Sequence, residues 1–148
     1  MAKGILLVED SNDDVELVRR AFQQCKIANP IFVVSSAEEA LAHLHRCKTP
    51  KPGTSSDTTL VLLDLGLPGT DGIEVLKVLA STNQLRQCPV VVLSAASELK
   101  KVNECYKLGA TSFLLKPITT ADVMNLAQNI PKLRLELAST AESRPSAV

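Results

Sequence analysis

The sequence predicts a doubly wound α/β fold, a (βα)5 three-layer sandwich built around a parallel five-stranded sheet. Five short apolar or β-branched runs alternate along the chain with five segments of helical length, which is typical of strand-helix-strand units. The 148 residues suit one ordinary domain, and a composition of 45% hydrophobic and 22% charged residues is globular. Because such units join parallel strands by right-handed crossovers, we expect helices on both faces of the sheet.

The predicted strands are rich in branched and aromatic side chains, which favour extended backbone. They span Gly4 to Val8, Ile31 to Ser35, Thr59 to Leu63, Pro89 to Leu93 and Thr111 to Leu115.

The helical segments between these strands repeat apolar residues every three or four positions. In the first, Asn12 is a plausible N-cap and the apolar face is Val15, Val18, Phe22 and Cys25. The second runs from about Ala37 to Arg46, and the third opens near Asp71. The fourth carries Leu99, Val102, Cys105 and Tyr106 and stops at Gly109, a natural C-cap. The fifth begins near Thr120 and carries Val123, Leu126, Ala127 and Ile130.

Two segments fall outside this alternation. Lys48 to Thr58 is rich in Pro, Gly, Ser and Thr, which predicts a long loop. We expect a domain of residues 1–130 followed by a C-terminal extension of residues 131–148. In this extension Leu133, Leu135 and Leu137 alternate with charged residues, and we expect the polar end that follows them to be partly disordered.

Composition excludes several classes of function. Sixteen basic and sixteen acidic residues leave no net charge, which argues against a nucleic-acid partner. No apolar stretch is long enough to span a membrane, and the N-terminus lacks a secretory signal, so we expect a cytoplasmic protein. Four scattered cysteines without a CxxC pair argue against structural zinc and predict reduced thiols.

Polar side chains recur where the predicted strands end. Glu9 and Asp10 follow the first strand, Asp64 the third, Ser94 the fourth and Lys116 the fifth. Ligands bind at this carboxyl edge of an open parallel sheet, so we expect these groups to converge on one site.

Three carboxylates held together repel one another unless a cation lies among them. Mg²⁺ suits such a site because it prefers hard oxygen ligands. Lys116 would pair with Asp64, while the Ser94 hydroxyl and the Ala95 amide could donate hydrogen bonds to phosphoryl oxygens. The sequence therefore predicts a magnesium-dependent phosphoryl site.

Four motifs carry a resemblance to a known family. LLVEDS, LLDLGLPGTDG, VVVLSAA and GATSFLLKP resemble, in order and spacing, the receiver domains of two-component response regulators across residues 4 to about 130. The stretch EDSNDDVEL and the long loop before the third strand are further similar to the cyanobacterial phytochrome-associated single-domain response regulators. This resemblance implies the flavodoxin-like form of the predicted fold.

The resemblance also implies a role for each site residue. Asp64 would accept a phosphoryl group from a sensor histidine kinase, with Asp10 binding Mg²⁺ directly, Glu9 binding it through water and the Gly66 carbonyl completing the protein ligands. Lys116 would contact the phosphoryl group, and its bond to Pro117 would be cis. Ser94 and Phe113 would form a switch pair.

One departure from the family pattern concerns Gly66 and Ala96, where other members often carry longer or polar side chains. Both positions border the path of the hydrolytic water, so we expect slow autodephosphorylation. The resemblance implies a signalling protein, not an enzyme, whose output is binding, either to a downstream protein or back to the kinase as a phosphoryl sink or relay. We also expect a homodimer through the fourth helix, fifth strand and fifth helix, with the segment Lys132 to Leu137 taking part. Alternatively, Pro131 starts a short helical continuation that folds the leucines of this segment back onto their own domain.

Plainer interpretations of these residues stay open. Each site side chain could be structural: a cap, an ordinary ion-pair partner or core. Asp13, Asp14 and Glu16 are interpreted as a solvated first helical turn that favours the helix dipole. A dinucleotide-binding enzyme would need a Gly-rich turn where this chain has EDSND. A pseudo-receiver that only binds proteins remains the stronger alternative, although such modules typically lose an acidic or lysine site residue and this chain keeps them.

Overall fold

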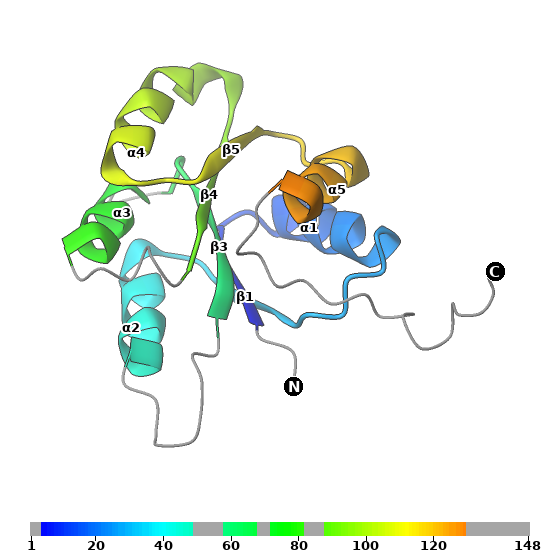
Figure 1. Ribbon diagram of the computed structural model, residues 1–148, viewed down its shortest axis with the longest axis horizontal. Helices are drawn as coiled ribbons and strands as arrows, with labels where there is room; N and C mark the ends of the chain where they lie inside the picture. The colour runs from blue at the N-terminus through cyan, green and yellow to red at the C-terminus, as the bar shows by residue number, and fades with distance from the viewer. Residues whose placement is uncertain (1–3, 49–57, 68–71, 82–87, 130–148) are drawn as a thin grey trace.

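Five parallel strands form one sheet in the order β2-β1-β3-β4-β5 (Figure 1). The computed structural model describes residues 4–48, 58–67, 72–81 and 88–129. The strands are β1 (Gly4–Val8), β2 (Ile31–Val34), β3 (Thr58–Asp64), β4 (Val90–Ser94) and β5 (Ser112–Leu115). The helices are α1 (Asn12–Gln24), α2 (Ala37–Lys48), α3 (Gly72–Ser81), the 3-10 helix η2 (Ala96–Lys101), α4 (Val102–Leu108) and α5 (Thr120–Asn129). The predicted doubly wound (βα)5 fold is confirmed.

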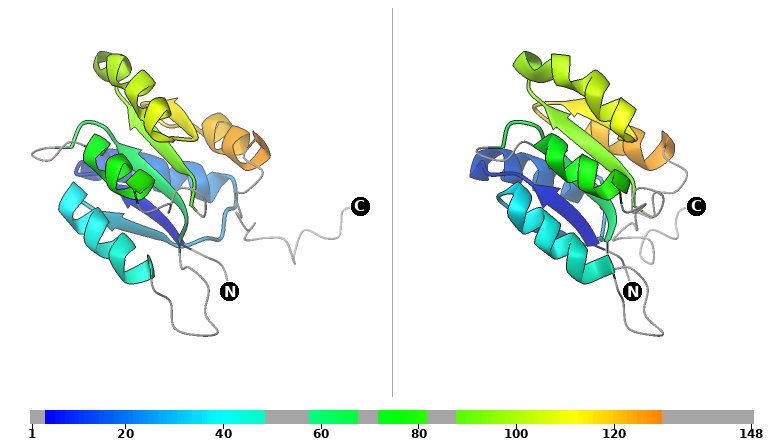
Figure 2. Two further views of the ribbon diagram at one scale, coloured as in Figure 1. Left: turned by 60° about the vertical axis from the view of Figure 1, so that its left-hand side comes forward. Right: turned by 90° about the vertical axis from the view of Figure 1, so that its left-hand side faces the viewer.

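Helices cover both faces of the sheet and create two hydrophobic cores. α1 and α5 lie on one face, whereas α2, α3 and α4 lie on the other (Figure 2). Successive residues of β1 alternate between them: Leu6 and Val8 join the core under α2, α3 and α4, while Ile5 and Leu7 join the core under α1 and α5. The period of two along a strand thus explains why β1 is apolar throughout.

Local side chains fix where several helices begin and end. Ser11, not Asn12, caps α1, because its hydroxyl oxygen accepts the Asp14 N–H at 3.3 Å. Asn12 is the first helical residue, so the predicted cap was one position late. Thr119 and Asp122 cap α5 reciprocally. Gly109 ends α4 with φ of 112°, a conformation that favours glycine, as predicted.

Three side chains of the predicted apolar helix faces are exposed rather than buried. Leu99 is 44% exposed because it belongs to η2, which precedes α4. Tyr106 is 43% exposed while its ring packs edge-on against Phe113, and Ala127 is also exposed. The helical period extended each face beyond the residues that the sheet covers.

Several sequence predictions lie outside the described residues. These are the interior of the Lys48 to Thr58 loop, Ile130 and the C-terminal extension with its three leucines. Within the described part of the chain, no helix is long and apolar enough to cross a membrane.

Gly72 allows the start of α3 to approach the end of β3. A Cβ atom at this position would lie 2.6 Å from the backbone oxygen of Asp64, which is a steric clash. The absence of a side chain therefore lets α3 pack against the residue that ends β3.

We expect Gly72→Ala to lower the free energy of unfolding by roughly 1–3 kcal/mol, since the backbone must move to relieve the clash. At an unobstructed helical position the same change usually stabilises, by up to about 1 kcal/mol. Urea unfolding of both proteins measures the sign. Unchanged or increased stability of the variant would contradict the close approach.

Candidate functional site

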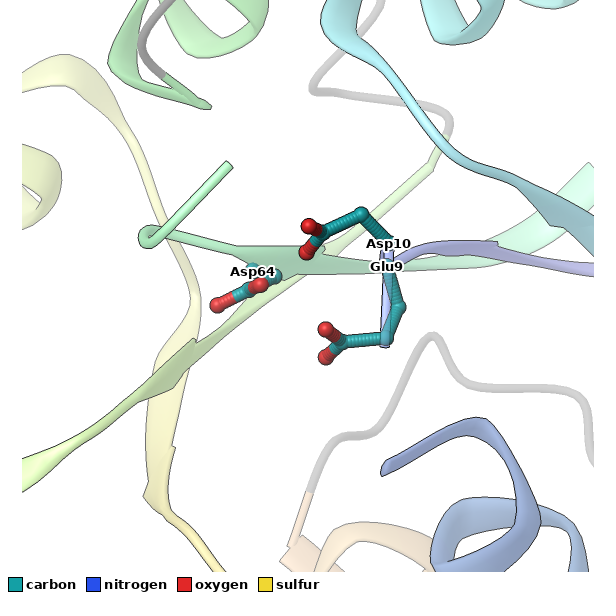
Figure 3. Close-up of side chains that lie close together, drawn as sticks. All are labelled: Glu9, Asp10 and Asp64. Atoms are coloured by element: carbon teal, nitrogen blue, oxygen red, sulfur yellow. The ribbon is translucent and has the colours of Figure 1, made fainter. Parts of the chain in front are cut away.

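The carboxyl ends of β1, β3, β4 and β5 meet at one edge of the sheet, as the sequence predicted. The register places Val8 beside Leu63, Asp64 beside Leu93 and Ser94 beside Leu115. The acidic residues that end β1 and β3 consequently come together: ligand oxygens of Glu9, Asp10 and Asp64 all lie within 4.8 Å of one another (Figure 3).

Lys116 connects three separate parts of this edge. Its Nζ lies 3.0 Å from Glu9 Oε1, 3.0 Å from Asp64 Oδ1 and 3.1 Å from Asp14 Oδ2. Burial works to lower the pKa of Lys116, but the close contacts of its ammonium group with the carboxylates of Glu9, Asp64 and Asp14 outweigh it and raise the pKa. Lys116 is therefore a fixed positive charge beside Asp64. Its peptide bond to Pro117 is cis, as predicted.

Asp14 corrects the sequence analysis, which treated it as part of a solvated turn. It is half-buried, and its carboxylate reaches Lys116 from the first turn of α1. Asp13 and Glu16 are exposed, so the prediction holds for them. The relevant signal was position: Asp14 faces the same way as Val18, four residues later, which is buried.

Glu9 is an almost fully buried carboxylate, with its side chain 1% exposed. The Ser11 N–H donates to its Oε2 at 3.3 Å. Its Oε1 lies within ion-pair distance of Lys116 yet makes no hydrogen bond of acceptable geometry. Burial, opposed by Lys116 and reinforced by Asp64, raises the pKa of the Glu9 carboxyl to about 7.

The acidic cluster fits a divalent cation. Glu9 and Asp64 are buried while Asp10 is exposed, so the cluster faces solvent on the Asp10 side. Glu9 Oε1 is buried and accepts no hydrogen bond. A bound cation would supply the interaction that this oxygen lacks. Carboxylate oxygens are the ligands that Mg²⁺ and similar hard cations prefer.

Ser94 ends β4 and Ala95 follows it, directly after Leu93, the residue of β4 that pairs with Asp64. Ser94 is fully buried, and its hydroxyl donates to the Ala95 carbonyl oxygen at 2.9 Å. The Ala95 N–H donates to Glu98 Oε1 at 3.1 Å. The two donors predicted to face an anion are therefore both engaged within the chain.

Gly66 and Phe113 complete the predicted site. The Gly66 N–H donates to Asp64 Oδ1 at 2.9 Å, which orients this carboxylate. Phe113 is half-buried on β5 and meets the Tyr106 ring edge-on, with centroids 6.4 Å apart. Its position is intermediate between solvent and core.

The thiols that the structure describes lie outside the acidic cluster. Cys88 and Cys105 are buried, Cys25 is half-buried, and none of these three forms a disulfide. The expectation of reduced, partly buried thiols is confirmed for them; the side chain of Cys47 lies outside the described residues.

Comparison with known proteins identifies the class. Residues 5–128 match the family model of the response regulator receiver domain. The chain is 33% identical over 138 residues to "Response regulator Rcp1" of Synechocystis sp., covering 90% of each chain. It is 32% identical over 133 residues to "Two-component response regulator ARR6" of Arabidopsis thaliana, covering 87% of this chain and 69% of the relative.

Solved structures agree with this assignment. The bacteriophytochrome response regulator RtBRR superposes with a TM-score of 0.76 at 34% identity, over 98% of this chain and 86% of that one. The phosphorylated cyanobacterial phytochrome response regulator RcpA gives 0.70 at 28% identity, over 91% and 99%. The Mn²⁺-bound form of Rcp1 gives 0.67 at 31% identity, over 90% and 99%.

The chain therefore belongs to the response regulator receiver family. It is a signalling protein of the two-component type, and its relatives include the phytochrome response regulators that its sequence resembles.

We expect a divalent cation to stabilise the fold through the acidic cluster, because it relieves repulsion that exists only when the carboxylates are held together. At tenfold excess over its dissociation constant, Mg²⁺ should raise the melting temperature by about 3–6 °C. Thermal melting with Mg²⁺ and with chelator measures the shift.

Asp10→Asn should lose most of this shift. The matched control is Asp13→Asn, which removes the same charge from an exposed residue outside the cluster and should keep the shift. Equal shifts in wild type and Asp10→Asn would contradict binding at this cluster.

Proposed function

We propose that Asp64 is the phosphoacceptor, and that it takes a phosphoryl group from a phosphohistidine of a sensor histidine kinase. The observation that carries the proposal is the contact of 3.0 Å between Lys116 Nζ and Asp64 Oδ1, beside the acidic cluster. In transfer, an Asp64 oxygen forms a bond to phosphorus as the bond to the histidine nitrogen breaks, and the released imidazole keeps the electron pair.

The surrounding side chains support this chemistry. Lys116 supplies positive charge where the phosphoryl oxygens gain negative charge, and the Ala95 amide can donate to another oxygen. Glu9, Asp10, Asp64 and the Gly66 carbonyl would hold Mg²⁺. A bound Mg²⁺ would neutralise phosphoryl charge.

We infer that phosphorylation is read through Ser94 and Phe113. The Ser94 hydroxyl donates to the Ala95 carbonyl, a bond that rotation about its side chain can exchange for one to a phosphoryl oxygen. The half-buried Phe113 can then turn further into the core that it already borders. The two residues lie on neighbouring strands, β4 and β5, so the movement of one opens space for the other.

The lifetime of the phosphorylated state should be long. Neither Gly66 nor Ala96 offers a polar side chain to orient a hydrolytic water, so one source of acceleration is missing. We infer slow autodephosphorylation as the only further reaction of the chain.

The signalling context follows from the relatives. Several are named as phytochrome or bacteriophytochrome response regulators, which supports a phytochrome-like kinase as the phosphodonor. We propose a cytoplasmic receiver domain of residues 1–130, with residues 131–148 as an extension, that signals by binding a downstream protein.

We further propose a homodimer. Tyr106 on α4, Leu115 on β5 and Met124 on α5 are 43%, 46% and 44% exposed, so this side of the molecule carries apolar surface that the monomer leaves in water. The leucines of Lys132 to Leu137 would add to the interface, at roughly 1.5–3 kcal/mol for each fully buried side chain.

Acetyl phosphate with Mg²⁺ should label the wild-type chain with one phosphoryl group, and Asp64→Asn should stay unlabelled because it lacks the nucleophilic oxygen. Intact-mass spectrometry measures the labelled fraction. The outcome also separates a phosphoacceptor from a pseudo-receiver that only binds proteins.

Asp13→Asn is the control and should label like wild type, since its side chain is exposed and outside the cluster. Transfer of the labelled protein to donor-free buffer measures the rate of loss. Labelling of Asp64→Asn to the wild-type level would refute the assignment.

The wild-type chain should sediment as a dimer at micromolar concentrations, and Leu115→Glu should shift it toward monomer because a buried charge would face the partner. Val33→Glu is the matched control: Val33 is 37% exposed on β2, the opposite edge of the sheet. A wild-type monomer, with or without phosphodonor, would rule out the dimer. Truncation after Ile130 tests the contribution of the extension separately.

A further inference from the structure

Glu98 of η2 lies next to the site, although the sequence analysis did not predict it as a site residue. Its Oε1 accepts the Ala95 N–H at 3.1 Å. Its Oε2 lies 2.8 Å from the point that a Cβ atom of Gly66 would occupy, and Asp64 Oδ1 lies 3.5 Å from the same point. Glu98 thus places a carboxylate oxygen in the space that the missing side chain of Gly66 leaves open, a space that Asp64 Oδ1 also borders.

An ordinary capping role accounts for only part of this geometry. A Glu three residues into a helix often accepts the N-cap amide, and the N-cap side chain normally returns a hydrogen bond. Here the N-cap residue is Ala95, whose methyl group can return none. The capped amide is also the donor that the proposed function assigns to a phosphoryl oxygen.

The geometry points to Glu98 as an internal competitor of the phosphoryl group: its carboxylate occupies the Ala95 amide in the unphosphorylated chain and must leave before a phosphoryl oxygen can take that amide. One N–H cannot fully serve two anionic acceptors, and two anions this close repel each other. This inference rests on the proposed phosphorylation of Asp64.

Displacing Glu98 requires little rearrangement of the fold. Its segment, η2, contains no buried residue, and Ala96, Ser97, Leu99 and Lys100 are exposed. The segment is tied to the end of β4 by the Glu98 side chain and by the Glu98 N–H, which donates to the Ala95 carbonyl at 2.9 Å. Phosphorylation would therefore change the position of an exposed segment that a partner protein can contact.

The first test compares initial rates of phosphorylation by acetyl phosphate with saturating Mg²⁺. Glu98→Gln keeps the length and one acceptor oxygen but removes the charge, so its rate should rise roughly threefold; Glu98→Ala removes both and should rise roughly tenfold. The control Glu104→Gln removes an equal charge from an exposed residue of α4 and should leave the rate unchanged.

A double-mutant cycle gives a readout that general loosening of η2 would not produce. In wild type, Gly66→Ala places a methyl group against Glu98 Oε2, so it should displace the carboxylate and raise the rate. In the Glu98→Ala background there is no carboxylate to displace, so the increase caused by the same change should be smaller than in wild type.

Three results would overturn the inference while leaving the proposed function intact. The first is equal rates of phosphorylation for wild type and Glu98→Gln. The second is a Gly66→Ala effect on the rate that is equal in the wild-type and Glu98→Ala backgrounds. The third is a Glu98→Gln substitution that changes only the rate at which the phosphoryl group is lost. The last result would make Glu98 a residue that orients the hydrolytic water. Absence of labelling in wild type would instead refute the proposed function itself.

Discussion

The arrangement of the site depends on the ammonium group of Lys116. Three carboxylates, from the end of β1, the first turn of α1 and the end of β3, lie within 3.1 Å of its Nζ. Without this charge, Glu9 and Asp64 would be buried anions facing each other, which is costly in a protein interior. Lys116 therefore holds Asp64, the proposed phosphoacceptor, in place, and it joins the first and last strands along the chain, β1 and β5.

One ammonium does not balance all the acidic groups around it. Asp10 adds a fourth carboxylate to Glu9, Asp14 and Asp64, and the Glu9 pKa of about 7 records the cost of burying one of them. An excess of negative charge of this kind attracts a divalent cation from the Asp10 side and opposes the approach of a phosphoryl group. The cation and the phosphoryl group are thus expected to depend on each other, because each neutralises the charge that the other faces.

Much of the site could be predicted because its residues follow buried strands. Glu9, Asp64, Ser94 and Lys116 each stand where an apolar run ends, and parallel strands must bring such positions to one edge. Asp14 and Glu98 could not be found in this way. Both belong to helical segments rich in charge, in which the sequence does not distinguish a carboxylate that faces solvent from one that turns back toward the sheet.

The sequence by itself determined the order and type of the elements, because the period of apolar residues is a local property that burial imposes on each strand and helix. It also determined which residue types end the strands. The tertiary structure alone decided the contacts between distant segments, such as Asp14 with Lys116 and Glu98 with the space over Gly66. Those contacts depend on how helices pack across the sheet edge and on differences of a few ångströms between side chains, which the period of hydrophobic residues does not specify.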